Sequence, residues 1–331
     1  MLQRFFDYLL KNQVVFAVFI LFSAWFLFQI RDILFSVFLS YIIMAAVLPI
    51  TQFLRKRRVP KLLAVLIPYF SIALLFFLMI IPLIPFVIQQ IDALIMGFPK
   101  YLDQSAKFIG FKLDPKALQG YFNGQLSNLS SSAIAVTTQV FGGIFTLITI
   151  FIVSLYLLLY NDDFKRKFSR LFHRQHHDKV LNTLSLVNEK LGAWLQGQII
   201  LSFSIGFITW IALTLLGVPF SLPLALLAGI LEVVPTLGPT LSAIPAVIVA
   251  LTISPTLAIV VVATYILIQM LENQLLVPKI MERAVGLNPV VVILGVTIGA
   301  NLMGVVGALL SIPFISFIMV IYKSLEAQKV E

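Results

Sequence analysis

Glu232 and Glu272 are the only charged residues between Lys190 and Lys279, in a stretch made almost entirely of apolar side chains. A carboxylate in such surroundings must be paired, protonated or hydrated by a cavity, because an isolated buried charge is costly. Either residue could therefore bind a proton or a monovalent cation. The structural alternatives are a hydrogen bond from Glu232 to a neighbouring helix, and a capping or snorkelling contact from Glu272 to nearby basic residues.

Other polar residues accompany Glu272 in the sequence. Asn273 follows it directly, and Gln269 lies about one helical turn before it. Together with Glu232 they form our candidate ion-coupling group. The sequence has no phosphate-binding loop, no nucleophile with a base and no nucleotide-binding fingerprint. We therefore expect a protein that is not an enzyme and has no cofactor, with H+ or Na+ as the coupling ion.

Helix-breaking residues follow Glu232 inside the apolar run 223–253. Proline removes a backbone donor and clashes with the preceding turn, so a helix cannot pass unbroken through this break. Hydrocarbon tolerates the freed backbone groups only where they face protein or a wet cavity. We predict a re-entrant hairpin whose tip binds a polar ligand. In the alternative, the glycines of the break only permit close packing of helices. The candidate tip residues are Pro235, Thr236, Gly238 and Pro239.

The apolar run 289–322 repeats this pattern. It contains no charged residue and is interrupted by Asn301, Gly304 and Gly307, the candidate residues of a second tip. Both runs place a proline 15 residues before a glycine of the break. We therefore predict two broken hairpins in an inverted repeat, a known way of building a transport site. Two full membrane spans are the alternative for 289–322.

The composition places these segments in a membrane. Sixty per cent of the 331 residues are hydrophobic and only 11% are charged, which is more apolar surface than a soluble protein of this size could bury. The net charge of +9 is then a topology signal rather than a nucleic-acid footprint. The lack of cysteine excludes disulfides and thiolate sites. His173, His176 and His177 have no carboxylate or thiolate partners in the sequence, so we expect no metal site.

The predicted fold is an all-α, polytopic membrane protein with about eight membrane elements, because spans need roughly 20 apolar residues each. The positive-inside rule places the basic segments, and with them both termini, in the cytoplasm. The predicted order is membrane helices 1–3 in 1–91, an external amphipathic segment 92–132, helix 4 in 133–160, a basic loop with an interfacial helix in 161–197, a transport half 198–323 and a tail 324–331.

Three stretches of the sequence resemble the AI-2E family of transporters, the autoinducer-2 exporter-like proteins. They are residues 192–199 (GAWLQGQI), 217–246, and 269–289 continued by 304–313. The combination of P-x-x-G-P with E-N-x-L-x-x-P at this spacing is specific to the family. The sequence departs from the family pattern at Thr236 and Asn288, where many members carry an aromatic residue and a histidine.

The resemblance implies a multi-pass protein of the inner membrane that assembles as a homo-oligomer, a pentamer for some members. It also implies a secondary transporter that exports a small polar solute such as autoinducer-2 by alternating access, with an elevator-like movement suited to the inverted repeat. Sodium (or lithium)/proton antiport is the alternative. From a different class, the chain could be a non-transporting membrane scaffold or accessory subunit. The expected partners are a small polar solute or a monovalent cation, the lipid bilayer and further copies of the chain, but no nucleic acid.

Overall fold

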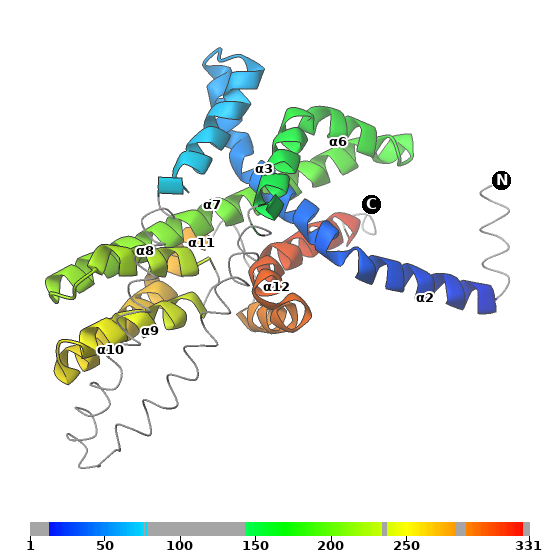
Figure 1. The fold of residues 1–331 in the computed structure, drawn as a ribbon. Helices are drawn as coiled ribbons and strands as arrows, with labels where there is room; N and C mark the ends of the chain where they lie inside the picture. The colour runs from blue at the N-terminus through cyan, green and yellow to red at the C-terminus, as the bar shows by residue number, and fades with distance from the viewer. Residues whose placement is uncertain are drawn as a thin grey trace.

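The computed structural model describes residues 13–75, 77–78, 143, 145–233, 237–281 and 289–326, and this part of the chain is helical (Figure 1). The helices are α2 (Gln13–Gln29), α3 (Arg31–Lys56), a helix over Lys61–Leu75, a helix over Phe145–Leu159, α6 (Asn161–Ser169), a 3-10 turn (Arg174–His176), α7 (His177–Leu215), α8 (Ser221–Leu231), α9 (Leu237–Leu251), α10 (Pro255–Leu271), a π-helical turn (Glu272–Leu276), α11 (Val277–Met281) and α12 (Pro289–Glu326).

Four helices among the described residues are long and apolar enough to cross a membrane, or five if the bent pair Phe145–Leu159 and α6 forms one span. The structure thus confirms an all-helical chain with several candidate spans. It does not confirm eight membrane elements. α8 has only 11 residues, or about 16 Å at 1.5 Å per residue, which is too short to cross hydrocarbon alone. The expected external segment 92–132 lies outside the described residues.

The long helix α7 is the centre of the described fold. It contacts α3, α6, α8, α10, α11 and α12 (Figure 1). Its buried residues recur every three or four positions, for example Val187, Leu191 and Trp194, which gives one continuous buried face. The expected interfacial helix 178–197 and the span that follows it are therefore parts of a single helix of 39 residues, because no proline interrupts this stretch.

Close backbone contacts dock α7 against its two main neighbours. A methyl group on Gly192 would overlap the backbone carbonyl of Ala45, so α3 packs directly against α7 there. Further along, Gly206 of α7 faces Gly229 of α8, and a side chain on either would meet the other helix's backbone. Glycine at these positions lets the helix backbones approach each other, as is common between membrane helices.

The first predicted break separates α8 from α9. Pro235 and Thr236 fall in this break and lie outside the described residues. A methyl group on Gly238 would overlap the carbonyl of Leu231 across the break. Contacts between α8 and α9 continue away from it, so the two helices form an antiparallel hairpin. α10 packs against the same pair, through a cluster that includes Leu224, Ala246 and Val261.

The second predicted break lies inside α12. Met303 and Gly304 have non-helical backbone angles, and Gly304 adopts φ 60° and ψ −140°, a conformation essentially restricted to glycine. Gly299 and Gly307 lie against each other's backbones. In a continuous helix, residues eight apart are about 12 Å from one another. The chain therefore folds back at Gly304, and the two limbs of α12 pack side by side.

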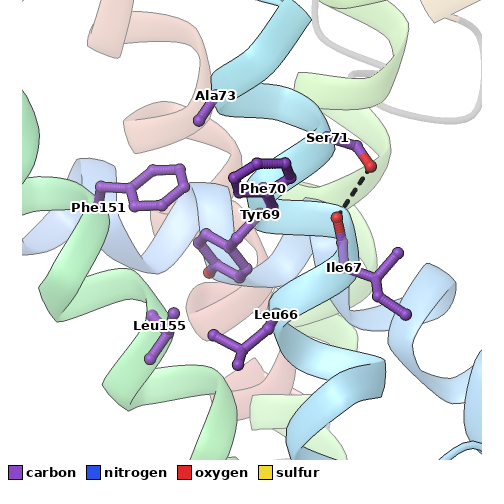
Figure 2. A pocket seen from close by; sticks show the side chains of 8 residues that line it. All are labelled: Leu66, Ile67, Tyr69, Phe70, Ser71, Ala73, Phe151 and Leu155. Atoms are coloured by element: carbon purple, nitrogen blue, oxygen red, sulfur yellow. Dashed lines mark hydrogen bonds between the residues drawn. The ribbon is translucent and has the colours of Figure 1, made fainter.

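A third group of helices surrounds α3. The helix over Lys61–Leu75 packs on it and on the helix over Phe145–Leu159, where the Tyr69 hydroxyl bonds the hydroxyl of Ser154. Figure 2 shows a pocket of about 420 Å³ between these two helices, next to Tyr69 and Phe151. The hydroxyl of Ser71 is used within its own helix, on the carbonyl of Ile67. The remaining lining is largely apolar, so the pocket offers little to a polar solute.

Candidate functional site

Glu232 follows the last residue of α8, at the break before α9, and its side chain is 0% exposed. The last carbonyls of a helix have no partner within the helix. Here the side-chain amide Nε2 of Gln198, on α7, donates to the backbone carbonyl of Glu232 over 2.8 Å. Gln198 is itself buried. α7 thus caps the end of α8 and fixes the position of Glu232.

The carboxyl groups of Glu232 and Glu272 lie close enough to interact, although 40 positions separate the two residues (272 − 232). Glu272 is only 2% exposed, and its Oε2 accepts a hydrogen bond from Nε2 of Gln269 over 3.2 Å. Neither side-chain oxygen of Glu232 has a hydrogen-bond partner of normal geometry in the structure. The fold therefore brings the two predicted glutamates together in a buried place, with acceptor capacity left unused.

A π-helical turn positions Glu272. The turn begins at Glu272 and joins α10 to α11. A π-helical turn fits an extra residue into the helix and is frequently found at functional sites. In this one, the Glu272 side chain is buried while Asn273 next to it is exposed. Of the predicted ion-coupling group, Glu232, Glu272 and Gln269 come together, and Asn273 points elsewhere.

Other buried polar atoms on the helices that carry this site also lack hydrogen-bond partners. Among the described residues, eight buried side-chain polar atoms have no hydrogen bond, and five of them belong to Ser202, Thr209, Glu232 and Tyr265. Ser202 and Thr209 lie on α7, and Tyr265 lies on α10 within the cluster that joins α8 and α9. Buried polar groups without a protein partner usually bond to water or an ion. The helices α7, α8 and α10 therefore offer buried polar atoms that a polar ligand could bind.

The described residues of the first tip lie beside this site. Gly238 and Pro239 are buried next to the end of α8, and the Pro239 carbonyl accepts a hydrogen bond from the Ser242 hydroxyl over 3.0 Å. The Ser242 hydroxyl is therefore already used in a hydrogen bond within α9. Gly238 is needed for the close approach to Leu231, which is the packing role that we kept as the alternative.

The second tip lies in α12, which packs on the part of α7 around Leu191 and Trp194. Asn301 is exposed, and its amide donates to the carbonyl of Thr297 on the preceding turn over 2.9 Å. Gly307 packs on Gly299, and Gly304 makes the turn. The α12 hairpin packs near α3, through a cluster that includes Leu310 and Ile42. No hydrogen bond among the described residues joins this tip to Glu232 or Glu272.

Gln198 is the main residue that our sequence reasoning missed. It is an uncharged amide at the first residue of the predicted transport half, directly after the segment 161–197 that we expected to hold an interfacial helix. Its position nevertheless continues the buried face of α7, four residues after Trp194 and three before Leu201. Helical periodicity extended through residue 198 would have placed this amide inside the protein.

An all-helical fold with several apolar spans, and with paired acidic residues buried beside a broken helix, defines a polytopic membrane protein of the kind that carries solutes or ions. The chain belongs to the family of AI-2E family transporters, whose sequence profile matches residues 14–327. This finding confirms the resemblance noted in the sequence and identifies the protein as a membrane transport protein.

Three relatives illustrate the similarity. "Putative transport protein YrrI" of Bacillus subtilis is 26% identical over 298 residues, covering 84% of this chain and 81% of the relative. "AI-2 transport protein TqsA" of Escherichia coli is 26% identical over 285 residues, covering 80% and 78%. "Putative transport protein MT0215" of Mycobacterium tuberculosis is 40% identical over 106 residues, covering 32% and 29%.

Proposed function

We propose that this protein is a secondary transporter of the inner membrane that exports a small polar solute by alternating access, with the Glu232–Glu272 pair as its coupling site. The observation that carries the proposal is the burial of these two neighbouring acidic side chains together beside the broken helix. The relative TqsA, named as an AI-2 transport protein and aligned over most of its length, supports an autoinducer-2-like signal as the solute.

The pair accounts for coupling because two carboxylates in one dry site cannot both be ionised without a counter-ion. Whenever the site is closed to water, the pair must hold a proton or a cation such as Na+. The unused acceptor capacity of the Glu232 oxygens provides a place for it. Releasing the ion on one side of the membrane and rebinding it on the other would drive the solute.

The packing along α7 supports an elevator-like movement. α3 packs near Gly192 of α7, whereas α8 packs further along, near Gly206. One helix therefore connects a body built around α3 with the body formed by α8, α9 and α10. In our proposal the second body moves against the first, the two breaks serve as re-entrant tips of an inverted repeat, and several copies of the chain assemble through their α3 bodies.

Sodium/proton antiport is a second candidate, favoured by the same unpartnered Glu232 oxygens. The two candidates share a site and differ in cargo. Antiport needs no organic solute, whereas solute export needs one and uses the ion only for coupling.

Radioactive-solute counterflow in proteoliposomes separates these functions. Vesicles preloaded with an unlabelled autoinducer-2-type sugar derivative are diluted into a labelled trace, and accumulation of label is followed with and without Na+. Export predicts transient accumulation that Glu232→Gln abolishes and that Glu189→Gln, a change on the exposed face of α7, leaves intact. No accumulation, together with cation-driven proton flux, would replace export by antiport. Neither activity in folded protein would leave the scaffold function.

A further inference from the structure

We propose that the elbow formed by α6 and the turn after it, residues 161–174, is a binding surface for anionic phospholipid headgroups. The segment lies outside the Glu232–Glu272 site, and this inference does not depend on what the protein transports.

The start of the elbow is where the membrane surface is expected. The apolar helix Phe145–Leu159 ends at Tyr160, and the chain then turns by 71° into α6. Tyr156 and Tyr160 lie at this end, both exposed, with stacked rings 6.3 Å apart. Tyrosines gather where hydrocarbon meets the headgroups. A helix that bends by this angle at the end of a span runs close to the membrane plane.

One face of the elbow is apolar and exposed. Phe164, Phe168 and Phe172 follow one another at four-residue spacing, and their ring centroids are 5.8 and 5.6 Å apart. Leu171, next to Phe172 at the end of this row, is 78% exposed. Phe164, Phe168 and Phe172 thus form a row of neighbouring aromatic rings, the aromatic ladder, along the elbow. Such a face on a short amphipathic helix is suited to the boundary between headgroups and acyl chains.

Basic side chains flank this ladder. Lys167, Arg170 and Arg174 are exposed and have no carboxylate within salt-bridge distance in the described part of the chain. In contrast, Arg166 is paired with Asp163 at 3.0 Å, and Lys165 donates to the Ser185 hydroxyl on α7. Three cations are therefore available to phosphate, while two others are already engaged. Each basic residue near an anionic surface contributes about a factor of five in affinity.

The elbow is also held in place against α7. Asn161, the first residue of α6, is buried and accepts a hydrogen bond from the side-chain amide of Asn188 over 3.4 Å. At the other end, the His177 ring contacts the carbonyl of Phe172 at 3.0 Å. The aromatic ladder and the three basic side chains therefore lie on a segment that is fixed at both ends by hydrogen bonds. The charge complements an anionic leaflet and disfavours a second copy of the same basic segment as the occupant.

Spin labels can test this directly, since the chain has no cysteine. Leu171→Cys, on the ladder side, is compared with Asp162→Cys, on the charged face of α6. Each labelled full-length protein is placed in nanodiscs with increasing fractions of phosphatidylglycerol in phosphatidylcholine. Power saturation then measures access to oxygen, which partitions into lipid, and to a nickel chelate, which stays in water. We expect a several-fold higher oxygen-to-nickel ratio at residue 171 than at 162, rising with the anionic fraction.

Charge variants test the headgroup contacts. Replacing Lys167, Arg170 and Arg174 by glutamine should mean that the oxygen-to-nickel ratio of the label at residue 171 rises only at much higher phosphatidylglycerol fractions. The same loss of charge at Arg55, Lys56 and Lys61, in the other basic segment, should not. Equal nickel access at 171 and 162, or an equal effect of both triple replacements, would overturn the proposal. So would a label at 171 that is shielded from both reagents and shows dipolar broadening, since a second copy would then cover the surface.

Discussion

The side chain of Gln198 holds the backbone of Glu232: its amide donates over 2.8 Å to the carbonyl at the end of α8. A donor on α7 thus sets the position of an acidic residue on the neighbouring helix. Because the bond goes to the backbone, the carboxyl group of Glu232 stays available for Glu272 or for an ion. If α8 moves relative to α7, this hydrogen bond must break, or the part of α7 around Gln198 must move together with α8.

The first prediction compares Gln198→Ala with Gln196→Ala. Gln196 makes an equivalent bond from α7 to the carbonyl of Ala46 on α3, over 2.7 Å. Each replacement removes one hydrogen bond between helices, at about 0.5–1.5 kcal/mol. We expect both variants to lower the melting temperature in detergent by similar amounts, while only Gln198→Ala raises the KM for the coupling cation. Equal KM values in the two variants would reduce Gln198 to a purely structural role.

The second prediction concerns stabilisation by cations. Sodium that binds at the acidic pair should raise the melting temperature of the purified protein as its concentration increases, because a ligand of the folded state stabilises it. Glu232→Gln removes one charge from the pair, so this sodium-dependent shift should disappear. The exposed Glu326 is the matched control, and Glu326→Gln should keep the shift. A shift that persists in Glu232→Gln places the cation elsewhere.

The third prediction tests the α12 hairpin. A methyl group on Gly307 would overlap the carbonyl of Gly299, so Gly307→Ala must push the two limbs apart. Overpacking of this kind costs about 1–3 kcal/mol. Val305→Ala, at an exposed position on the same limb, should have almost no effect. Thermal unfolding of both variants in one detergent provides the comparison, and similar melting temperatures would argue against the folded-back arrangement.

The fourth prediction addresses membrane depth at the first break. Ile253, between α9 and α10, and Val233, after α8, are both exposed in the structure. If the hairpin is re-entrant, an impermeant maleimide added outside should modify Ile253→Cys, and one added inside should not reach Val233→Cys. Rapid modification of Val233→Cys from the cytoplasmic side would mean that α8 spans the membrane.

The sequence predicts both chain breaks because proline and glycine have local conformational effects that need no knowledge of the fold. Gly304 is the clearest case, since its backbone angles suit glycine alone. The sequence also indicates Glu232 and Glu272 as site residues, because an acidic residue inside an apolar membrane segment usually has a functional role. The contact between them was not predictable. It depends on how α8 and α10 pack around α7, which is a property of tertiary structure.

Other details depend on packing in the same way. The π-helical turn that buries Glu272 and exposes Asn273 has no signature in local residue types. The continuity of α7 was missed because the change from a polar to an apolar composition near residue 198 resembles a boundary between two helices. The expected relation between the two hairpins remains a prediction, since they contact different parts of the protein.

Cation-driven proton flux tests the central claim most directly. Purified protein is reconstituted into liposomes with a trapped pH dye, and sodium, lithium or potassium is added outside. If the Glu232–Glu272 pair is the coupling site, the cation pulse should produce proton movement that both Glu232→Gln and Glu272→Gln abolish and that Glu189→Gln preserves. Undiminished flux in either variant of the pair, in protein that remains folded, would contradict the account.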